Sequence, residues 1–203
     1  MFDNNFIRYD ADHRQRIVVD YQDHCDDTVE ETTKAFGLRV LTCNHAVADI
    51  FGVDVEDDEN VLRSAQLEAI KTGEHVFFIE FGSHSSDWFK LRQRRPAIDW
   101  DSGFCGIIIV PHDAWLKAMP RKTYAKRFVY ETLCDEFDER VTANLNGWIY
   151  EAYVETDDGC IGFSGYLSEE EALADAMAEF PEIKYQEEDF EAITTYTLQA
   201  KRS

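Results

Sequence analysis

The stretch "GWIYEAYVETDDGCIGFSG", residues 147–165, decides the fold class. Between Trp148 and Val154 every second residue is apolar, and this period of two is typical of a β-strand. Asp158 and Gly159 then form a dipeptide that favours a tight turn between two antiparallel strands. The stretch therefore predicts a β-hairpin, and with it an antiparallel sheet.

Other short segments predict further strands. They are rich in β-branched or aromatic residues, and the two strongest, 75–82 and 105–110, are bounded by glycine. These segments are residues 16–22 (RIVVDYQ), 38–43 (LRVLTC), 75–82 (HVFFIEFG), 105–110 (CGIIIV) and, as a final edge strand, 194–200 (TTYTLQA).

Four helices are expected between these strands. A short one lies within residues 24–37 and ends at Gly37, and a second follows the acids at 56–59 and ends at Gly73. The longest lies within 123–147, where apolar residues recur every four positions from Val129. The last begins with a capping box, Ser168 to Glu171, and stops before Pro181.

This order of elements predicts an α+β fold, with a mainly antiparallel sheet and two to four helices packed on one side. We expect a single domain spanning residues 1–203, with the charge profile suggesting subdivision near residues 70 and 127. Hydrophobic residues make up 44% and aromatic residues 13% of the chain, which is typical of a globular protein and not of an acidic disordered one.

The sequence also predicts a cytoplasmic location. No apolar run is long enough to span a membrane, and the first residues lack the basic and apolar regions of a secretory signal. The five cysteines are an odd number without a C-x-x-C pair, a pattern that indicates free thiols in a reducing compartment.

Charge is the outlying property, with 41 acidic and 20 basic residues and a net charge of −21. Residues 1–70 carry −10, residues 71–127 carry +4 and residues 128–203 carry −15. Solubility, adaptation to high salt and mimicry of nucleic acid all remain open as explanations. Direct binding to DNA or to an anionic membrane through this charge is excluded, since phosphates would repel it.

Carboxylates gather in three groups that could stand where phosphates would. Acids three or four residues apart on a helix lie about 5–6 Å from one another, so they form rows. We expect the following residues to bind a partner: Glu56, Asp57, Asp58 and Glu59; Glu131, Asp135, Glu136, Asp138 and Glu139 on the long helix; and Glu169, Glu170, Asp175 and Glu179 on the last helix.

No catalytic residue or cofactor is predicted, because phosphate-binding glycine loops, G-x-S-x-G and H-E-x-x-H are all absent. Cys43 and His45 would share one face of a strand and are weak metal candidates, with His24, Cys25 or His84 as further ligands. The alternative is a buried cysteine beside a hydrogen-bonded histidine. His84 also lies among serines and Asp87, where a polar loop is favoured over a hydrolase site.

Two further clusters allow two interpretations each. Asp99 and Asp101 could hold Mg²⁺, but a turn is favoured, in which Gly103 and Gly106 let the backbone bend and Trp100 packs onto the sheet. The basic residues could bind a phosphate, or they could pair with the acids of this chain or of a partner. These are Lys90, Arg92, Arg94 and Arg95.

The run Trp100-Asp101-Ser102-Gly103-x-x-Gly106, followed by the apolar residues 107–110, resembles a family of small, mostly uncharacterised proteins from bacteriophages and plasmids. That family carries W-D-S-G-Q-x-G before an aromatic-rich strand, and Phe104 stands here in place of its Gln. Of the shared features, only the W-D-S-G run is specific.

Weaker similarities extend over roughly residues 16–180. Residues 147–150 are similar to a later G-x-V-Y-G-like strand, although Ala152 stands where the family often has Gly. Gly162-Phe163 matches a Trp-Gly-Phe-like segment, and Cys43 and His45 match an upstream C-x-H. The resemblance implies an accessory gene of a mobile element, of the kind that blunts host defence as an anti-CRISPR or anti-restriction protein.

Charge and resemblance together predict an acidic inhibitor of a host nucleic-acid-binding effector, a CRISPR or restriction nuclease, acting by DNA mimicry in the host cytoplasm. Its expected partner is a protein, with neither nucleic acid nor membrane bound directly, and homodimerisation is left open. One alternative is an inhibitor that binds through apolar Trp and Phe surfaces. Another is a small metal-dependent enzyme with a pocket built from His84, Asp99, Asp101 or Cys43.

Overall fold

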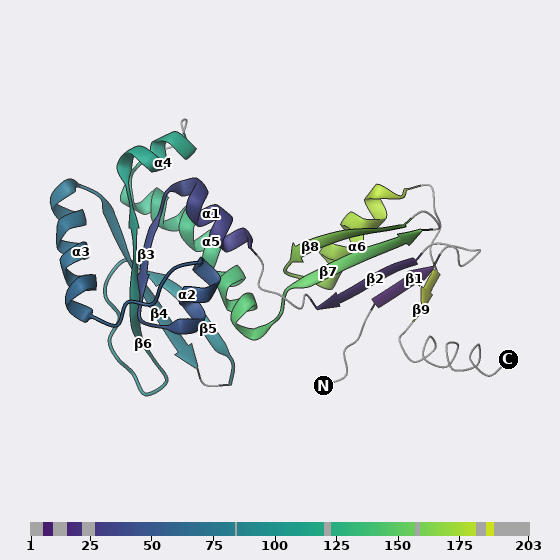
Figure 1. The fold of residues 1–203 in the computed structure, drawn as a ribbon, viewed down its shortest axis with the longest axis horizontal. Coiled ribbons are helices and arrows are strands. Elements are labelled where there is room, and N and C mark those ends of the chain that lie inside the picture. Colours follow the sequence, from purple (N-terminus) through teal and green to yellow (C-terminus); the bar gives the residue numbers. More distant parts are fainter. Residues whose placement is uncertain are drawn as a thin grey trace. The chain divides into compact units, whose positions relative to one another are not determined.

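The computed structural model describes residues 6–9, 16–21, 27–83, 85–119, 123–156, 159–181 and 186–188. The chain divides into two compact units (Figure 1). Unit 1 combines the two ends of the chain, residues 1–26 and 147–203, and unit 2 consists of residues 27–146. Each unit has its own antiparallel sheet, so the predicted α+β class is confirmed.

Unit 2 is built on a four-stranded sheet in the order β3-β6-β4-β5. Its strands are β3 (Arg39–Thr42), β4 (His75–Ser83), β5 (Asp87–Arg92) and β6 (Ser102–Val110). Its helices are α1 (Thr28–Phe36), α2 (His45–Phe51), α3 (Glu59–Thr72), α4 (His112–Ala118) and α5 (Lys126–Asn146).

The helices of unit 2 cover both faces of this sheet, not one face as predicted. On β4, Phe77 and Ile79 pack with α1, α2, α4 and α5, while Val76 and Phe78 pack on the α3 side with Ala69. The reason lies in the strand itself, because both sets of alternating residues are apolar and each face must be kept from water. On the larger side, Phe137 of α5 meets Phe51 of α2 edge-to-face at 5.3 Å between ring centroids.

Unit 1 contains a five-stranded sheet in the order β8-β7-β2-β1-β9. Its strands are β1 (Phe6–Tyr9), β2 (Arg16–Tyr21), β7 (Tyr150–Thr156), β8 (Gly159–Tyr166) and β9 (Gln186–Glu188). The helix α6 (Glu169–Glu179) covers one face through Ala172 and Ala176. The predicted hairpin is confirmed as β7 and β8, whereas its turn residue Asp158 and the strand expected at 194–200 lie outside the described residues.

The units do not divide where the charge profile changes. Residue 70 lies within α3 and residue 127 within α5, both inside unit 2. The division instead follows the pairing of β2 with β7, which joins the two ends of the chain into one sheet. Unit 1 carries 20 acidic and 6 basic residues, a net charge of −14, and unit 2 carries 21 and 14, a net charge of −7.

Candidate functional site

The W-D-S-G run forms a turn that leads into β6. The backbone N–H of Asp99 donates to the Ser102 carbonyl at 2.8 Å, and the Asp99 carboxylate accepts the backbone N–H of Trp100 at 2.8 Å. The carbonyl of Asp101 accepts the N–H of Ser83 at 2.9 Å, which ties the turn to the end of β4. These contacts support the turn interpretation.

Two details of that interpretation need correction. The side chain of Trp100 does not pack onto the sheet, because 76% of it is exposed. Gly106 does not bend the chain into the strand; it lies inside β6, where a Cβ atom would stand 2.5 Å from the carbonyl oxygen of Leu41. The glycine is required because β3 approaches so closely.

The metal candidates Cys43 and His45 do not lie on a strand, so they do not share a strand face. β3 ends at Thr42, and Asn44 caps α2 by accepting the N–H of Val47 at 3.0 Å. Cys43 is exposed, and both its N–H and its thiol donate to the Cys105 carbonyl, at 2.9 Å and 3.3 Å. Within the described part of the chain, no three His, Cys, Asp or Glu side chains could together hold a metal ion. His24, Cys25 and His84 lie outside that part.

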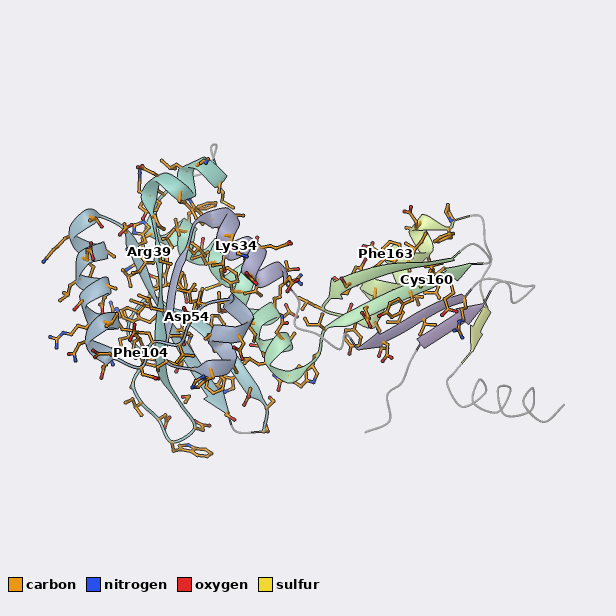
Figure 2. The ribbon with its side chains drawn as sticks, in the orientation of Figure 1. Lys34, Arg39, Asp54, Phe104, Cys160 and Phe163 are labelled. Carbon is orange, nitrogen blue, oxygen red and sulfur yellow. The ribbon has the colours of Figure 1, made fainter. Side chains whose placement is uncertain are left out.

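A cavity of about 300 Å³ opens beside the acidic group at 56–59. Arg95 pairs there with Glu59 at 2.5 Å, and its guanidinium lies 4.1 Å from the ring centroid of Phe104 (labelled in Figure 2). Asp58 caps α3 by accepting the N–H of Asn60 at 2.8 Å, and Glu56 accepts the N–H of Asp58 at 3.0 Å. Three of the four acids at 56–59 are therefore already bonded to other groups of unit 2. The lining residues are Cys43, Glu56, Asp57, Glu59, Leu62, Arg95, Ile98 and Phe104.

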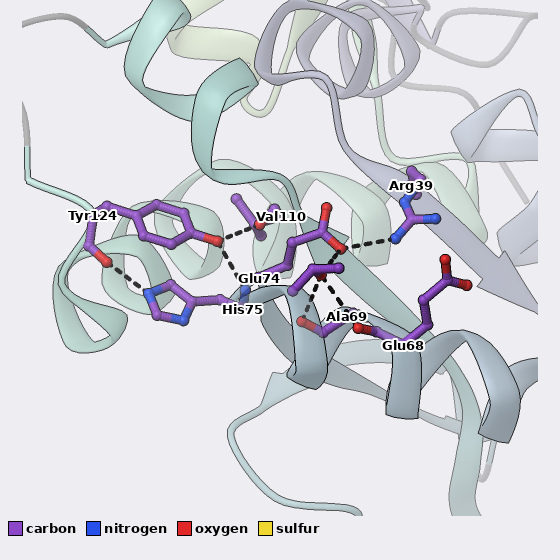
Figure 3. Close-up of polar contacts among 8 residues, drawn as sticks. Arg39, Glu68, Ala69, Glu74, His75, Val110 and Tyr124 are labelled. Carbon is purple, nitrogen blue, oxygen red and sulfur yellow. Dashed lines mark hydrogen bonds and ion pairs between the residues drawn. The ribbon is translucent and has the colours of Figure 1, made fainter.

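A second polar cluster joins His75 to Tyr124 at one end of the sheet (Figure 3). The Tyr124 hydroxyl accepts the backbone N–H of His75 at 2.8 Å and donates to the Val110 carbonyl at 2.5 Å. The His75 ring stacks on Tyr124 with centroids 4.1 Å apart, and burial raises the pKa of the Tyr124 hydroxyl. The Tyr124 hydroxyl thus accepts one hydrogen bond and donates another. These two bonds hold the segment before α5 against the ends of β4 and β6.

The helix α5 covers the outer edge of β5, taking the place of another strand. Asp138, Thr142 and Asn146, spaced four residues apart, accept the backbone N–H groups of Leu91, Phe89 and Asp87 at 2.9, 3.1 and 3.1 Å. Asn146 also donates to the Asp87 carbonyl at 2.7 Å, and the Tyr130 hydroxyl donates to the Leu91 carbonyl at 2.9 Å. An exposed sheet edge can pair with another chain, and these side chains prevent that.

Asp138 was predicted to bind a partner, yet it faces β5. Burial raises the pKa of its carboxyl, although the N–H of Leu91 and the nearby Lys90 and Arg92 act in the opposite direction. The sequence interpretation also missed Thr142 and Asn146. Thr142 and Asn146 follow Asp138 at intervals of four residues, directly beside the apolar stripe of α5. This spacing is the sequence pattern that indicates them.

The remaining acids of α5 are exposed, and among the described residues a cation pairs with one of them. Glu131 forms an ion pair with Arg127 at 2.7 Å, one helical turn away. Asp135, Glu136 and Glu139 also lie on the outer side of the helix. The helix contains three basic residues against five acids, so its net charge is only −2.

The helix α6 presents a different surface. It contains five acids and no basic residue. Glu171, Asp175 and Glu179 are exposed and lie four residues apart, so they form a row with a rise of about 6 Å per step. Among the described residues, no cation lies within 4.0 Å of any carboxylate of this helix. We call Glu171, Asp175 and Glu179 the α6 row.

The predicted acids of α6 lie at or beside this row. Glu170 is exposed, while Glu169 is half-buried and burial raises the pKa of its carboxyl, with Glu170 adding to the effect. Asp175 accepts a hydrogen bond from the Tyr166 hydroxyl at 3.1 Å, which orients its carboxylate. Glu171 was assigned only to the capping box, and Ser168 does accept its backbone N–H at 3.2 Å. Its spacing of four from Asp175 marks it as a member of the row.

Comparisons with protein families, with curated proteins and with solved structures found no match to this chain. No helix in the described part of the chain is long and apolar enough to cross a membrane.

Proposed function

We propose that this protein is an acidic decoy that inhibits a host nucleic-acid-binding defence effector, a CRISPR or restriction nuclease, in the host cytoplasm. The observation that carries the proposal is the α6 row, whose three exposed carboxylates have no described cation beside them. The row belongs to unit 1, which holds two thirds of the net charge of the chain.

The charge density of the row is a little over half that of one DNA strand. Its carboxylates follow one another at about 6 Å along the helix, whereas one strand of B-DNA carries roughly one charge per 3.4 Å of axis. A groove lined with Lys and Arg, built to neutralise phosphates, would gain from these carboxylates in the same way. Because a helix holds the row in place, little ordering is needed when the partner binds.

The same physics makes a decoy sensitive to salt. Contacts between exposed charges weaken strongly when the Debye length falls, as it does between about 0.1 M and about 0.5 M salt. We therefore expect the wild-type chain to capture a nucleic-acid-binding protein from host lysate at the lower salt and to lose it at the higher salt. Mass spectrometry identifies the captured protein.

A neutralised variant tests which surface is used. Glu171→Gln, Asp175→Asn and Glu179→Gln together keep the shape of the α6 row and remove its charge, so capture should be lost. The matched control is Glu131→Gln, Asp135→Asn and Glu139→Gln on α5, which removes the same charge from a helix that also holds cations. Equal capture by the wild type and the α6 variant would refute the role assigned to the row.

One observation favours the apolar alternative as a second candidate. In the segment between β5 and β6, Ile98 is 86% exposed and Trp100 is 76% exposed. Tryptophan is over-represented among the residues that dominate protein interfaces. If this loop is the binding surface, capture survives the higher salt and is lost with Trp100→Ala, while the α6 variant binds normally.

A further inference from the structure

We infer that the cavity between the start of α3 and the segment joining β5 to β6 binds an organic cation, a guanidinium or ammonium group carried on an apolar body. The cavity measures about 300 Å³, which lies at the lower end of the range of small-molecule sites. Separate parts of unit 2 form its walls: residue 43 after β3, residues 56–62, residues 95–98, and residue 104 of β6. The fold of unit 2 alone therefore forms the site.

Part of the cavity lining is apolar. Leu62 is buried, and Phe104 meets Phe78 edge-to-face with 6.2 Å between ring centroids, so both side chains are held by the packing of unit 2. Ile98, on the segment between β5 and β6, lines the cavity although it is 86% exposed. A ligand in contact with these side chains would remove apolar surface from water, most of all on Ile98. The fitting ligand therefore has an apolar part.

The charges of the lining select a cation. Three carboxylates and one guanidinium line the cavity, which gives a net charge of −2. Glu59 and Arg95 pair with one another, and one oxygen of Glu56 accepts the N–H of Asp58. Asp57 is exposed and has no hydrogen bond or ion pair with the described part of the chain. The lining would repel an anion, and a neutral ligand would not balance the charge of Asp57.

The chain itself shows that this lining can hold a guanidinium group. The guanidinium of Arg95 lies 4.1 Å from the ring centroid of Phe104 and 2.5 Å from a carboxylate oxygen of Glu59. An aromatic face and a carboxylate are the two kinds of group that attract organic cations in proteins. A cation that enters the cavity would meet the same combination, with Asp57 as its carboxylate and the apolar lining around its body.

Such a cation has two sources, a free molecule or an Arg or Lys side chain of a partner protein, and both present the same chemistry. Proteins that bind nucleic acid carry these side chains on their surfaces, so the cavity would give the proposed partner a second contact. The inference does not rest on the proposed function, because the cavity belongs to unit 2 and the α6 row to unit 1.

The test titrates the whole chain with 2-phenylethylguanidinium, and with its neutral isostere 2-phenylethylurea as the control ligand. Two-dimensional NMR reports binding through the backbone amide signals. We expect the guanidinium to cause saturable shifts at Leu62, Ile98 and Phe104, with a dissociation constant of about 1 mM or lower. The urea should bind at least about tenfold more weakly, because it offers the carboxylates no positive charge.

Variants locate the binding within the cavity. Asp57→Asn keeps the size of an exposed side chain and removes its charge, so it should weaken the guanidinium about tenfold. The matched control is Asp135→Asn on the exposed side of α5, which removes the same charge and should leave binding unchanged. Ile98→Ser, also at an exposed position, should weaken binding by removing part of the apolar lining.

The two sources are separated with chain purified from host cells. A small bound mass in native mass spectrometry that Asp57→Asn loses identifies a free cation. A captured protein that the guanidinium releases and the urea does not identifies a partner side chain. Either result supports the inference.

Three results would overturn the inference: no shift at the cavity or shifts confined to α6, equal affinity for the guanidinium and the urea, or an Asp57→Asn variant that binds like the wild type. Each of these leaves capture through the α6 row unaffected. Conversely, loss of capture on neutralising the α6 row does not alter binding of the guanidinium, so the two proposals fail separately.

Discussion

The helices α5 and α6 carry five acidic residues each, yet they use them differently. On α5, Asp138 accepts the N–H of Leu91 and Glu131 pairs with Arg127. On α6, the three carboxylates of the row are exposed, and no described cation lies beside them. An acid on a helix therefore does not always face outward, and Asp138 differs from the exposed acids of both helices because the edge of β5 lies next to it.

The largest expected difference between the two helices lies in how they are anchored. Phe137 of α5 is fully buried, and Phe137→Ala should lower the free energy of unfolding by about 3–5 kcal/mol, through lost contacts and a cavity. Ala176 is one of the two fully buried residues of α6 and buries only a methyl group, so Ala176→Gly should cost about 1 kcal/mol. Urea unfolding measures both, and equal losses would show that the two helices are anchored alike.

The next largest effect separates the two kinds of acid on α5. Asp138→Leu removes the acceptor for the N–H of Leu91 and should cost about 1–3 kcal/mol, the penalty for an unsatisfied buried donor. Asp135→Leu, on the exposed side, should change the free energy of unfolding by no more than about 0.5 kcal/mol. Amide hydrogen exchange gives a local measurement, in which Leu91 should exchange faster in the first variant alone. An unchanged exchange rate at Leu91 would show that Asp138 does not protect the edge of β5.

The smallest effect is a pH dependence. Burial raises the pKa of Asp138 above its value in the unfolded chain, so the folded state holds the proton more tightly. Its contribution to stability is therefore greatest below the unfolded pKa and falls as the pH rises through the folded pKa. Asp138→Asn keeps an acceptor for Leu91 and has no charge to bury.

The stability of Asp138→Asn relative to the wild type should accordingly increase as the pH rises from acidic to neutral. Thermal unfolding of both proteins across this range measures the difference, in which the titrations of all other groups cancel. A difference that stays constant, or that falls with pH, would mean that burial does not dominate the environment of Asp138.

The sequence predicts those elements whose patterns are local. The hairpin, β4, β6 and the helices α3, α5 and α6 each follow from alternation, a four-residue repeat or a cap within the segment itself. The sequence favours a polar loop around His84 and Asp87 and does not indicate the strand β5, because the outer edge of β5 is stabilised by α5, about fifty residues later. The helix α2 was missed because it is only seven residues long, and its cap, Asn44, was assigned to a strand.

Contacts between distant residues account for the other differences. The two units arise because β2 pairs with β7, and no feature of either strand alone indicates that partner. The role of Asp138 depends on β5, so its spacing in the sequence could only suggest an outward row. The sequence analysis expects Trp100 to pack onto the sheet, but the turn from Asp99 to Ser102 carries its side chain into solvent.

The most direct test of the decoy proposal is competition for DNA. A captured nucleic-acid-binding protein is loaded with fluorescent duplex DNA, and displacement by this chain is measured over a series of salt concentrations. The account predicts that the wild type displaces the DNA and that neutralising the α6 row lowers the salt slope by about one for each residue changed. The matched α5 variant should remain close to the wild type. Displacement by the α6 variant with the wild-type affinity and salt slope would contradict the account.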